Sequence, residues 1–185
     1  CPLRGVFEQG AAEAEKSREE EKAKNEEYLL TRIGGDAALT AAVDEFYTRL
    51  IKDETLAPFF EGVDMEVLKD HQRKFLRLAF TKIPESIDVG KLLLDKHQRL
   101  FGMGLNATHF DSVAVHLVGT LQHLGVAQEL IDEAVGIVGP LRGVFEQGAA
   151  EAEKSREEEK AKNEEYLLTR IGGDAALTAA VDEFY

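Results

Sequence analysis

The sequence predicts an all-helical protein, and three observations support that prediction. The chain of 185 residues has 4 prolines and no tryptophan and is rich in Ala, Leu, Glu and Lys, residues that favour helices. Apolar side chains recur at three- and four-residue steps in successive segments, the spacing of one helix face. A strongly charged stretch carries no Gly or Pro between Ala11 and Ile33.

Charge and composition exclude several partners. The formal net charge of -13 would repel nucleic acid and an anionic membrane, so we expect neither as a partner. No apolar run approaches the roughly 18 residues of a membrane span, and no signal-peptide pattern opens the chain. A single cysteine, Cys1, fits a reducing compartment. We therefore expect a cytoplasmic protein.

Two segments of the chain are identical. Pro2–Tyr47 recurs without a change as Pro140–Tyr185, an offset of 138 residues. Either the parent protein is a recent tandem array, or its ends were duplicated on purpose. We expect a linker over residues 1–28 that ends a preceding unit, a folded domain over 29–147, a second linker over 148–166 and an incomplete second unit over 167–185. The spare copy could also swap into a neighbouring chain.

The charged stretch predicts a solvated helix. Glu13–Glu27 holds 11 charged residues in 15, with opposite charges three and four residues apart. Each such pair stabilises an isolated helix by roughly 0.2–0.5 kcal/mol. A helix that is polar all round is typical of a bridge between folded units, and a disordered linker is the alternative. As a helix, Gly148–Glu165 would span about 27 Å.

The first half of the folded domain predicts two amphipathic helices. Asp36 is a candidate N-cap for the first of them. The apolar face of that helix comprises Leu39, Val43, Phe46, Leu50 and Ile51, with Tyr47 beside it. After a break at 56–62, a helix from about Asp64 to Lys82 places on one face Leu68, His71, Gln72, Phe75 and Ala79. Polar side chains within such a stripe are costly unless they have partners.

The next helix, about 91–101, presents a histidine on an apolar face. Leu93 lies one turn before His97, and Leu100 and Phe101 lie one turn after it. A neutral imidazole in apolar surroundings suits a buried metal, haem iron included. A core histidine bonded to a backbone carbonyl is the alternative.

Two further helices are predicted. The first follows Thr108, a candidate cap, and its buried face comprises Phe110, Val113, Leu117, Leu121 and Leu124. Its three histidines, His109, His116 and His123, repeat every seven residues, about 10.5 Å apart along the axis, which is too far to share a metal. We take them as a surface stripe. A last helix with Leu130 and Val138 is expected to run past Pro140 into the charged segment.

An ordered set of short motifs resembles one family. The motifs are Gly34-Gly35, Val43–Tyr47, Asp53, Pro58–Gly62, Val63–Met65, His71-Gln72 with Phe75, His97, and Gly104–Asn106 with His109–Asp111. Together they resemble the truncated (2/2) globins of group I, most closely the cyanobacterial and algal members. The resemblance covers about residues 28–145 and implies a small all-α globin that binds haem b, iron protoporphyrin IX.

The resemblance implies a role for several residues. His97 matches the proximal iron ligand, and Phe60 matches a phenylalanine that packs against the porphyrin. Tyr47 and Gln72 match the distal pair that hydrogen-bonds the gas ligand. Leu68 and Phe75 match the distal walls. We expect further haem contacts from Leu93, Phe110 and Val113, which lie on the apolar faces of their helices.

Two finer expectations come from the same resemblance. His71 matches a position from which some relatives ligate iron on the distal side, whereas in others the residue there reaches a haem propionate. A cyanobacterial branch bonds haem covalently through a histidine near the end of the last helix, and 139–145 contains none. We therefore expect non-covalent haem b, with His97 and His71 as candidate iron ligands.

The expected function is binding of O2, NO and CO. Conversion of NO and O2 to nitrate, with electrons from a reductase, is one possibility for the chemistry. The alternatives are O2 storage or transport by a multi-domain tandem globin, and a structural array of beads on charged rods.

Overall fold

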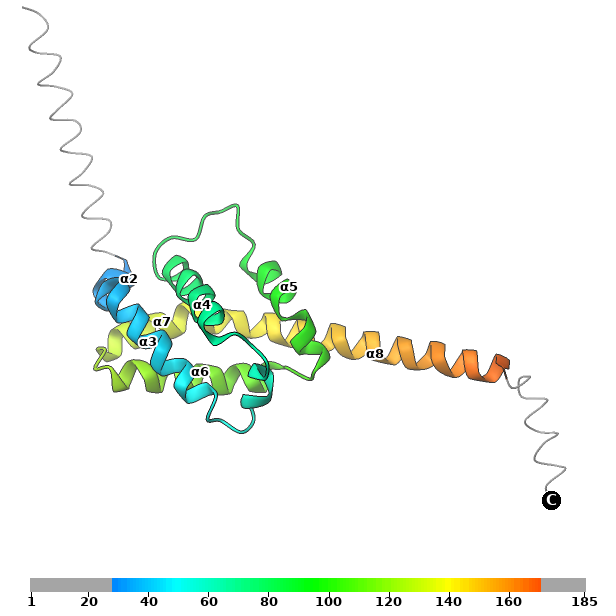
Figure 1. Cartoon of the computed structure of the whole chain (residues 1–185). Helices are drawn as coiled ribbons and strands as arrows, with labels where there is room; N and C mark the ends of the chain where they lie inside the picture. The colour runs from blue at the N-terminus through cyan, green and yellow to red at the C-terminus, as the bar shows by residue number, and fades with distance from the viewer. Residues whose placement is uncertain (1–27, 171–185) are drawn as a thin grey trace, which may run out of the picture. The chain divides into compact units, whose positions relative to one another are not determined.

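The computed structural model describes residues 28–170, and every regular element in that range is helical (Figure 1). In chain order the elements are α2 (Leu29–Arg32), α3 (Gly35–Leu50), the 3-10 turn η1 (Ala57–Phe60), α4 (Met65–Ala79), α5 (Val89–Gly102), α6 (Ala107–His123), α7 (Gln128–Val138), the 3-10 turn η2 (Gly139–Leu141) and α8 (Arg142–Arg170). The predicted all-α class is confirmed. No helix in residues 28–170 has the length and apolar character needed to cross a bilayer.

The described chain divides into two compact units. Residues 28–89 and 108–142 form the first unit, which holds α2, α3, η1, α4, α7, η2 and all but the first residue of α6. Residues 90–107 and 143–170 form the second unit, which holds α5 and α8 except for the first residue of each. The predicted distal residues therefore belong to the first unit, and the predicted proximal histidine to the second.

The core of the first unit comes mainly from α2, α3, α4, α6 and α7. Val43 is fully buried and Ile131 is 1% exposed, and burial of each such side chain contributes about 1.5–3 kcal/mol. The predicted apolar face of α3 is confirmed except at Ile51, which is 47% exposed. Leu124, predicted as part of the α6 face, is 40% exposed. Both lie just past a helix end, where helical periodicity no longer applies.

The start of α3 differs from the prediction. Its N-cap is Gly34, with φ 108°, and Gly35 follows with φ 72°. A side chain at Gly34 would be strained by this φ and would bring its Cβ to 2.9 Å from the Cβ of Ala38. Asp36 makes no capping bond and instead pairs with Arg77 of α4 at 2.8 Å. The predicted Asp36 cap is therefore wrong.

Two other helix starts were also predicted. The helix expected to begin at about Asp64 begins at Met65. Asp64 is its N-cap, because its Oδ1 accepts from the backbone N–H of Glu66 at 3.0 Å and of Val67 at 3.2 Å. That helix ends at Ala79, three residues earlier than expected. Thr108 is not a cap, because α6 already begins at Ala107.

The last predicted helix is interrupted at Pro140. Proline lacks the N–H that a helix interior needs, and its ring clashes with the carbonyl four residues before it. The chain therefore leaves α7 at Val138, passes through the 3-10 turn Gly139–Leu141 and begins α8 at Arg142. The expectation of one helix running through Pro140 is wrong.

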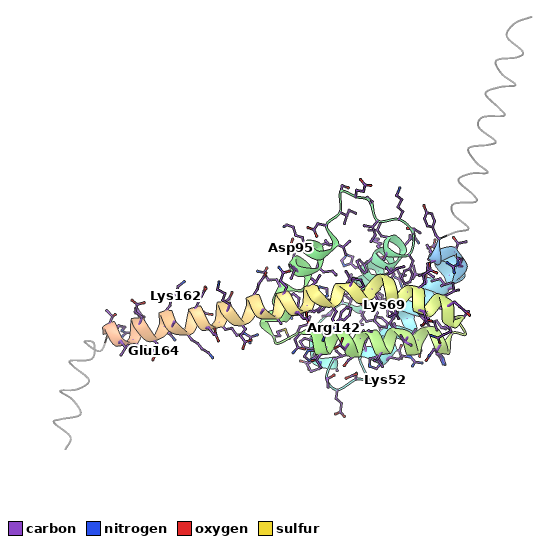
Figure 2. All side chains as sticks on the ribbon, turned by 180° about the vertical axis from the view of Figure 1, so that it is seen from behind. Lys52, Lys69, Asp95, Arg142, Lys162 and Glu164 are labelled. Atoms are coloured by element: carbon purple, nitrogen blue, oxygen red, sulfur yellow. The ribbon has the colours of Figure 1, made fainter. Side chains whose placement is uncertain are left out.

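The second charged segment is helical, as predicted. Residues 148–166 lie inside α8, and Lys162 and Glu164 project outward from it (Figure 2). Every residue from 157 to 170 is exposed. The first copy of the charged segment, in residues 1–27, and residues 171–185 of the second repeat copy lie outside the described residues.

Candidate functional site

The predicted distal donors meet in the first unit. Tyr47 on α3 is 4% exposed, and its hydroxyl donates to Oε1 of Gln72 on α4 at 3.4 Å. That distance is long for such a bond, so the hydroxyl is only weakly held by the amide. Because Gln72 accepts through its oxygen, its amide nitrogen is the group that can donate to a ligand. The structure thus brings both predicted donors together.

Burial keeps the Tyr47 phenol protonated. Desolvation raises the pKa of Tyr47 well above its ordinary value near 10, so the hydroxyl is a donor at any physiological pH. Phe46 packs edge-on against the ring at 5.5 Å between centroids, and Phe60 does so at 5.9 Å. The ring therefore has apolar neighbours on two sides, and the hydroxyl is its polar end.

The other predicted wall residues of the first unit are half-buried. Phe60, Leu68, Phe75 and Val113 each pack against the core and keep part of their surface exposed. Phe110 on α6 is also half-buried. His71 on α4 is exposed. Partly exposed apolar side chains beside a buried phenol form a surface suited to a flat apolar ligand.

The predicted proximal residue lies in the second unit. His97 on α5 is half-buried, and its Nδ1 lies 2.9 Å from the carbonyl oxygen of Leu93, one turn earlier. A carbonyl can only accept, so Nδ1 carries the proton and Nε2 has a lone pair. Burial lowers the pKa of His97, and the bond to Leu93 partly opposes that shift. The imidazole is therefore neutral at neutral pH.

Two phenylalanines flank this imidazole. The Phe101 ring lies 6.3 Å from the His97 ring, and the Phe145 ring lies 5.3 Å from it, with the two phenylalanines edge-on to each other at 5.8 Å. The position of Phe101 near His97 was predictable, because the two residues share a helix face. Phe145 was not predictable, because it comes from α8 and no local pattern indicates a contact across 48 residues.

The donor set fits a haem better than a bare metal ion. A metal held by side chains alone needs three or four ligands, and no cluster of three His, Cys, Asp or Glu side chains occurs within residues 28–170. A porphyrin supplies four nitrogens itself and needs one neutral imidazole from the protein. His97, with Nδ1 bonded to a carbonyl and Nε2 unprotonated, has the state that such a ligand requires.

The histidines of α6 do more than line a surface. His116 donates from Nε2 to Oδ2 of Asp53 at 2.7 Å, and His109 packs edge-on against Phe59 at 5.0 Å between centroids. Asp53 also accepts from the N–H and hydroxyl of Thr55. The bond from His116, followed by those from Thr55, lowers the pKa of Asp53. His109 and His116 are thus half-buried members of the predicted surface stripe that have partners, whereas His123 is exposed.

These two contacts fasten the segment that carries Phe60. Asp53 follows α3, and Phe59 lies in η1, so both contacts tie residues 53–60 to α6. They help to hold Phe60 beside Tyr47. The sequence indicated neither contact, because His116 lies 63 residues from Asp53 and His109 lies 50 residues from Phe59.

Comparison with known proteins identifies the family. The family described as "Bacterial-like globin" matches residues 28–146, well over half of the chain. The chain belongs to the bacterial-like globins. The cofactor of this globin is haem b, as the resemblance of its motifs implied.

The relatives of this globin agree with that assignment. It is 38% identical over 112 residues to the group 1 truncated haemoglobin GlbN of Synechocystis, covering 60% of this chain and 89% of the relative. The THB4 protein of Chlamydomonas reinhardtii has 45% identity and a TM-score of 0.57, covering 64% of this chain and 94% of that one. The 2/2 haemoglobin of Synechococcus, whose structure carries covalently attached haem, has 39% identity and a TM-score of 0.58, with 64% and 97% covered. The 2/2 truncated globin fold is thereby confirmed.

Proposed function

We propose that this globin binds O2 and NO at a haem held by His97 on the proximal side and screened by Tyr47 and Gln72 on the distal side. The observation that supports it most directly is the bond between Nδ1 of His97 and the carbonyl of Leu93. When bound, haem supplies an iron that takes up small gas ligands and exchanges electrons. The protein residues decide how strongly a ligand is held.

On the proximal side, the second unit prepares His97 as a ligand. The Leu93 carbonyl orients the ring and fixes the proton on Nδ1, which makes Nε2 the more basic nitrogen. Leu93 is itself half-buried, one turn before His97. We assign Leu93, Phe110 and Val113 as apolar contacts of the porphyrin, together with Phe60, Leu68 and Phe75.

On the distal side, the first unit supplies two donors. A gas ligand that carries partial negative charge is stabilised by the Tyr47 hydroxyl and the Gln72 amide, which donate to it away from water. Such stabilisation slows ligand release. Slow O2 release favours conversion of NO and O2 to nitrate, supported by an external reductase, over rapid O2 delivery. We therefore propose NO dioxygenation as the chemistry, with CO as a further, inhibitory ligand.

The identical segments favour a second candidate function. Pro2–Tyr47 and Pro140–Tyr185 each join a charged segment to the start of a globin unit. A tandem array built this way would carry several haems per chain and serve O2 storage or transport, or space its globins along charged helices. Rapid and reversible O2 exchange would support that second function over NO chemistry.

His71 is proposed as a sixth ligand to the iron. It follows Leu68 by three residues and precedes Phe75 by four on α4, so all three share one face of the helix. Contact with a haem propionate is the alternative role for this exposed imidazole. We also propose that the haem is held without a covalent bond, because α8 contains no histidine.

Absorption spectra of the ferric, ferrous and CO-bound protein test the proposal. The unmutated chain should show a haem spectrum with histidine as the proximal ligand in all three states. His97→Gly should lose that spectrum, and added imidazole should restore it by occupying the space of the missing ring. His123→Gly is the matched control, because His123 is an exposed histidine in the last turn of α6. An unchanged ligand spectrum in His97→Gly contradicts the assignment.

A further inference from the structure

One face of α8 packs against the helix that carries His97. Phe145, Gly148, Ala152 and Arg156 follow one another at steps of three, four and four residues, so they share that face. Gly148 is buried and Ala152 is half-buried, whereas every residue from 153 to 170, Arg156 included, is classed as exposed. The packed face thus extends well into the segment that its charge alone marks as a spacer.

Gly148 permits the close approach of the two helices. A Cβ at Gly148 would overlap the ring of Phe101, which is 3% exposed and lies one turn after His97. Glycine in a helix interior is less stable than alanine by roughly 0.5–1 kcal/mol, so its presence needs a reason. The reason is the Phe101 ring, which lies where a side chain at Gly148 would be.

Arg156 completes the C-terminal cap of α5. Gly104, with φ 102°, donates to the carbonyl of Phe101 at 3.0 Å, and Leu105 donates to the carbonyl of Leu100 at 3.0 Å, a Schellman motif. Nη2 of Arg156 donates to the carbonyls of Phe101 at 2.9 Å and of Gly102 at 3.0 Å.

Two effects favour these hydrogen bonds from Arg156. The guanidinium is charged, and charge-assisted hydrogen bonds are stronger than neutral ones. A cation is also favoured at the negative C-terminal end of a helix. Arg156 therefore stabilises the last turn of α5, one turn past His97.

We propose that α8 is a positioning element for His97: Phe145, Gly148 and Arg156 hold α5, so the placement of the charged helix sets how the proximal histidine meets the iron. The proposal rests on the proposed function, in which His97 is the iron ligand. Phe145 contacts the imidazole itself, and Gly148 and Arg156 act through Phe101 and the end of α5. A force or a partner on the exposed part of α8 would therefore reach the haem from its proximal side.

The duplicated segment provides a matched control. Phe7, Gly10 and Arg18 of the first copy correspond to Phe145, Gly148 and Arg156, within identical surrounding sequence. In a tandem array, each charged helix would hold the proximal helix of the unit before it and carry the next unit at its far end. In this chain the second copy has that role. Arg156→Ala should therefore disturb the end of α5 and the placement of His97, and Arg18→Ala should leave both unchanged.

The test compares these variants in the full chain reconstituted with haem. The first readout is amide hydrogen exchange at 103–105, which reports the end of α5. The second is the Fe–His stretching band just after CO photolysis, when any distal ligand is absent. Arg156→Ala should speed that exchange about tenfold or more, because two charge-assisted bonds are lost, and should shift the band. Arg156→Lys should show smaller changes in both the exchange rate and the band than Arg156→Ala, since lysine can reach one carbonyl.

A second variant tests the contact between α5 and α8. Gly148→Ala should displace the Phe101 ring and shift the band in a chain whose far-ultraviolet circular dichroism is unchanged. Faster exchange in Arg156→Ala with an unmoved band would overturn the positioning role, since the contact would then be structural only. An effect of Arg18→Ala in place of Arg156→Ala would overturn the assignment to α8. Absence of any Fe–His band in the unmutated protein would instead contradict His97 ligation, the proposed function itself.

Discussion

Removal of the Tyr47 hydroxyl should speed O2 release by about 10- to 100-fold, which follows from the loss of one hydrogen bond to a partly charged ligand worth roughly 1.5–3 kcal/mol. Tyr47→Phe keeps the ring and its edge-on contacts with Phe46 and Phe60, so it leaves no cavity. The present partner of the hydroxyl, Gln72, is 3.4 Å away, so the free protein loses little. The change should therefore act on the bound ligand and leave the melting temperature nearly unaltered.

The assay is stopped-flow measurement of O2 dissociation from the ferrous protein, with CO as the displacing ligand. Tyr185→Phe is the control, because Tyr185 is preceded by the same sequence as Tyr47 and lies outside the described residues. An unchanged rate in Tyr47→Phe would refute the reasoning that this phenol is the main distal donor. A faster rate in Tyr185→Phe alone would mean that the second copy of the repeat occupies the domain.

Three further outcomes are expected. The ferric protein without added ligand should show a low-spin absorption and EPR spectrum that His71→Ala converts to high-spin, and a high-spin spectrum before mutation would exclude His71 as a ligand. Acid–acetone extraction should remove all haem from the polypeptide, whereas haem retained on the chain would contradict non-covalent binding. Because the pKa of Asp53 is lowered in the folded state, the unfolded state binds more protons as the pH falls below about 4, so acid should reduce the free energy of unfolding. Asp53→Asn should flatten that acid limb in urea titrations at several pH values, and an unaltered limb would show that the bond from His116 contributes no stability.

Periodicity placed most helices well, because a helix face depends on residues three and four apart. The face of α3 that contains Val43 and Phe46 was predicted, as was the face of α6 that contains Leu117 and Leu121. The errors occur at helix ends. Asp36 is not a cap because two glycines with positive φ begin α3, and Pro140 divides the last helix into two.

In the candidate site, too, some features were predictable from the sequence and others were not. The sequence predicted which residues the candidate site contains, since His97, Tyr47 and Gln72 belong to an ordered set of motifs. The protonation states of these residues were not predictable from the sequence. The proton position on His97 depends on how close the Leu93 carbonyl lies, and the protonation of Tyr47 depends on burial by residues from other helices.

The sequence by itself therefore determined that this protein is a helical globin that binds haem, and it predicted a proximal histidine and polar distal residues. Only the tertiary structure decided that His116 and Asp53 fasten the segment beside Tyr47, and that Gly148 and Arg156 hold the helix of His97. The physical reason is separation along the chain. Helical periodicity and capping act within a few residues, whereas these contacts join residues 47 to 63 positions apart and exist only once the helices pack.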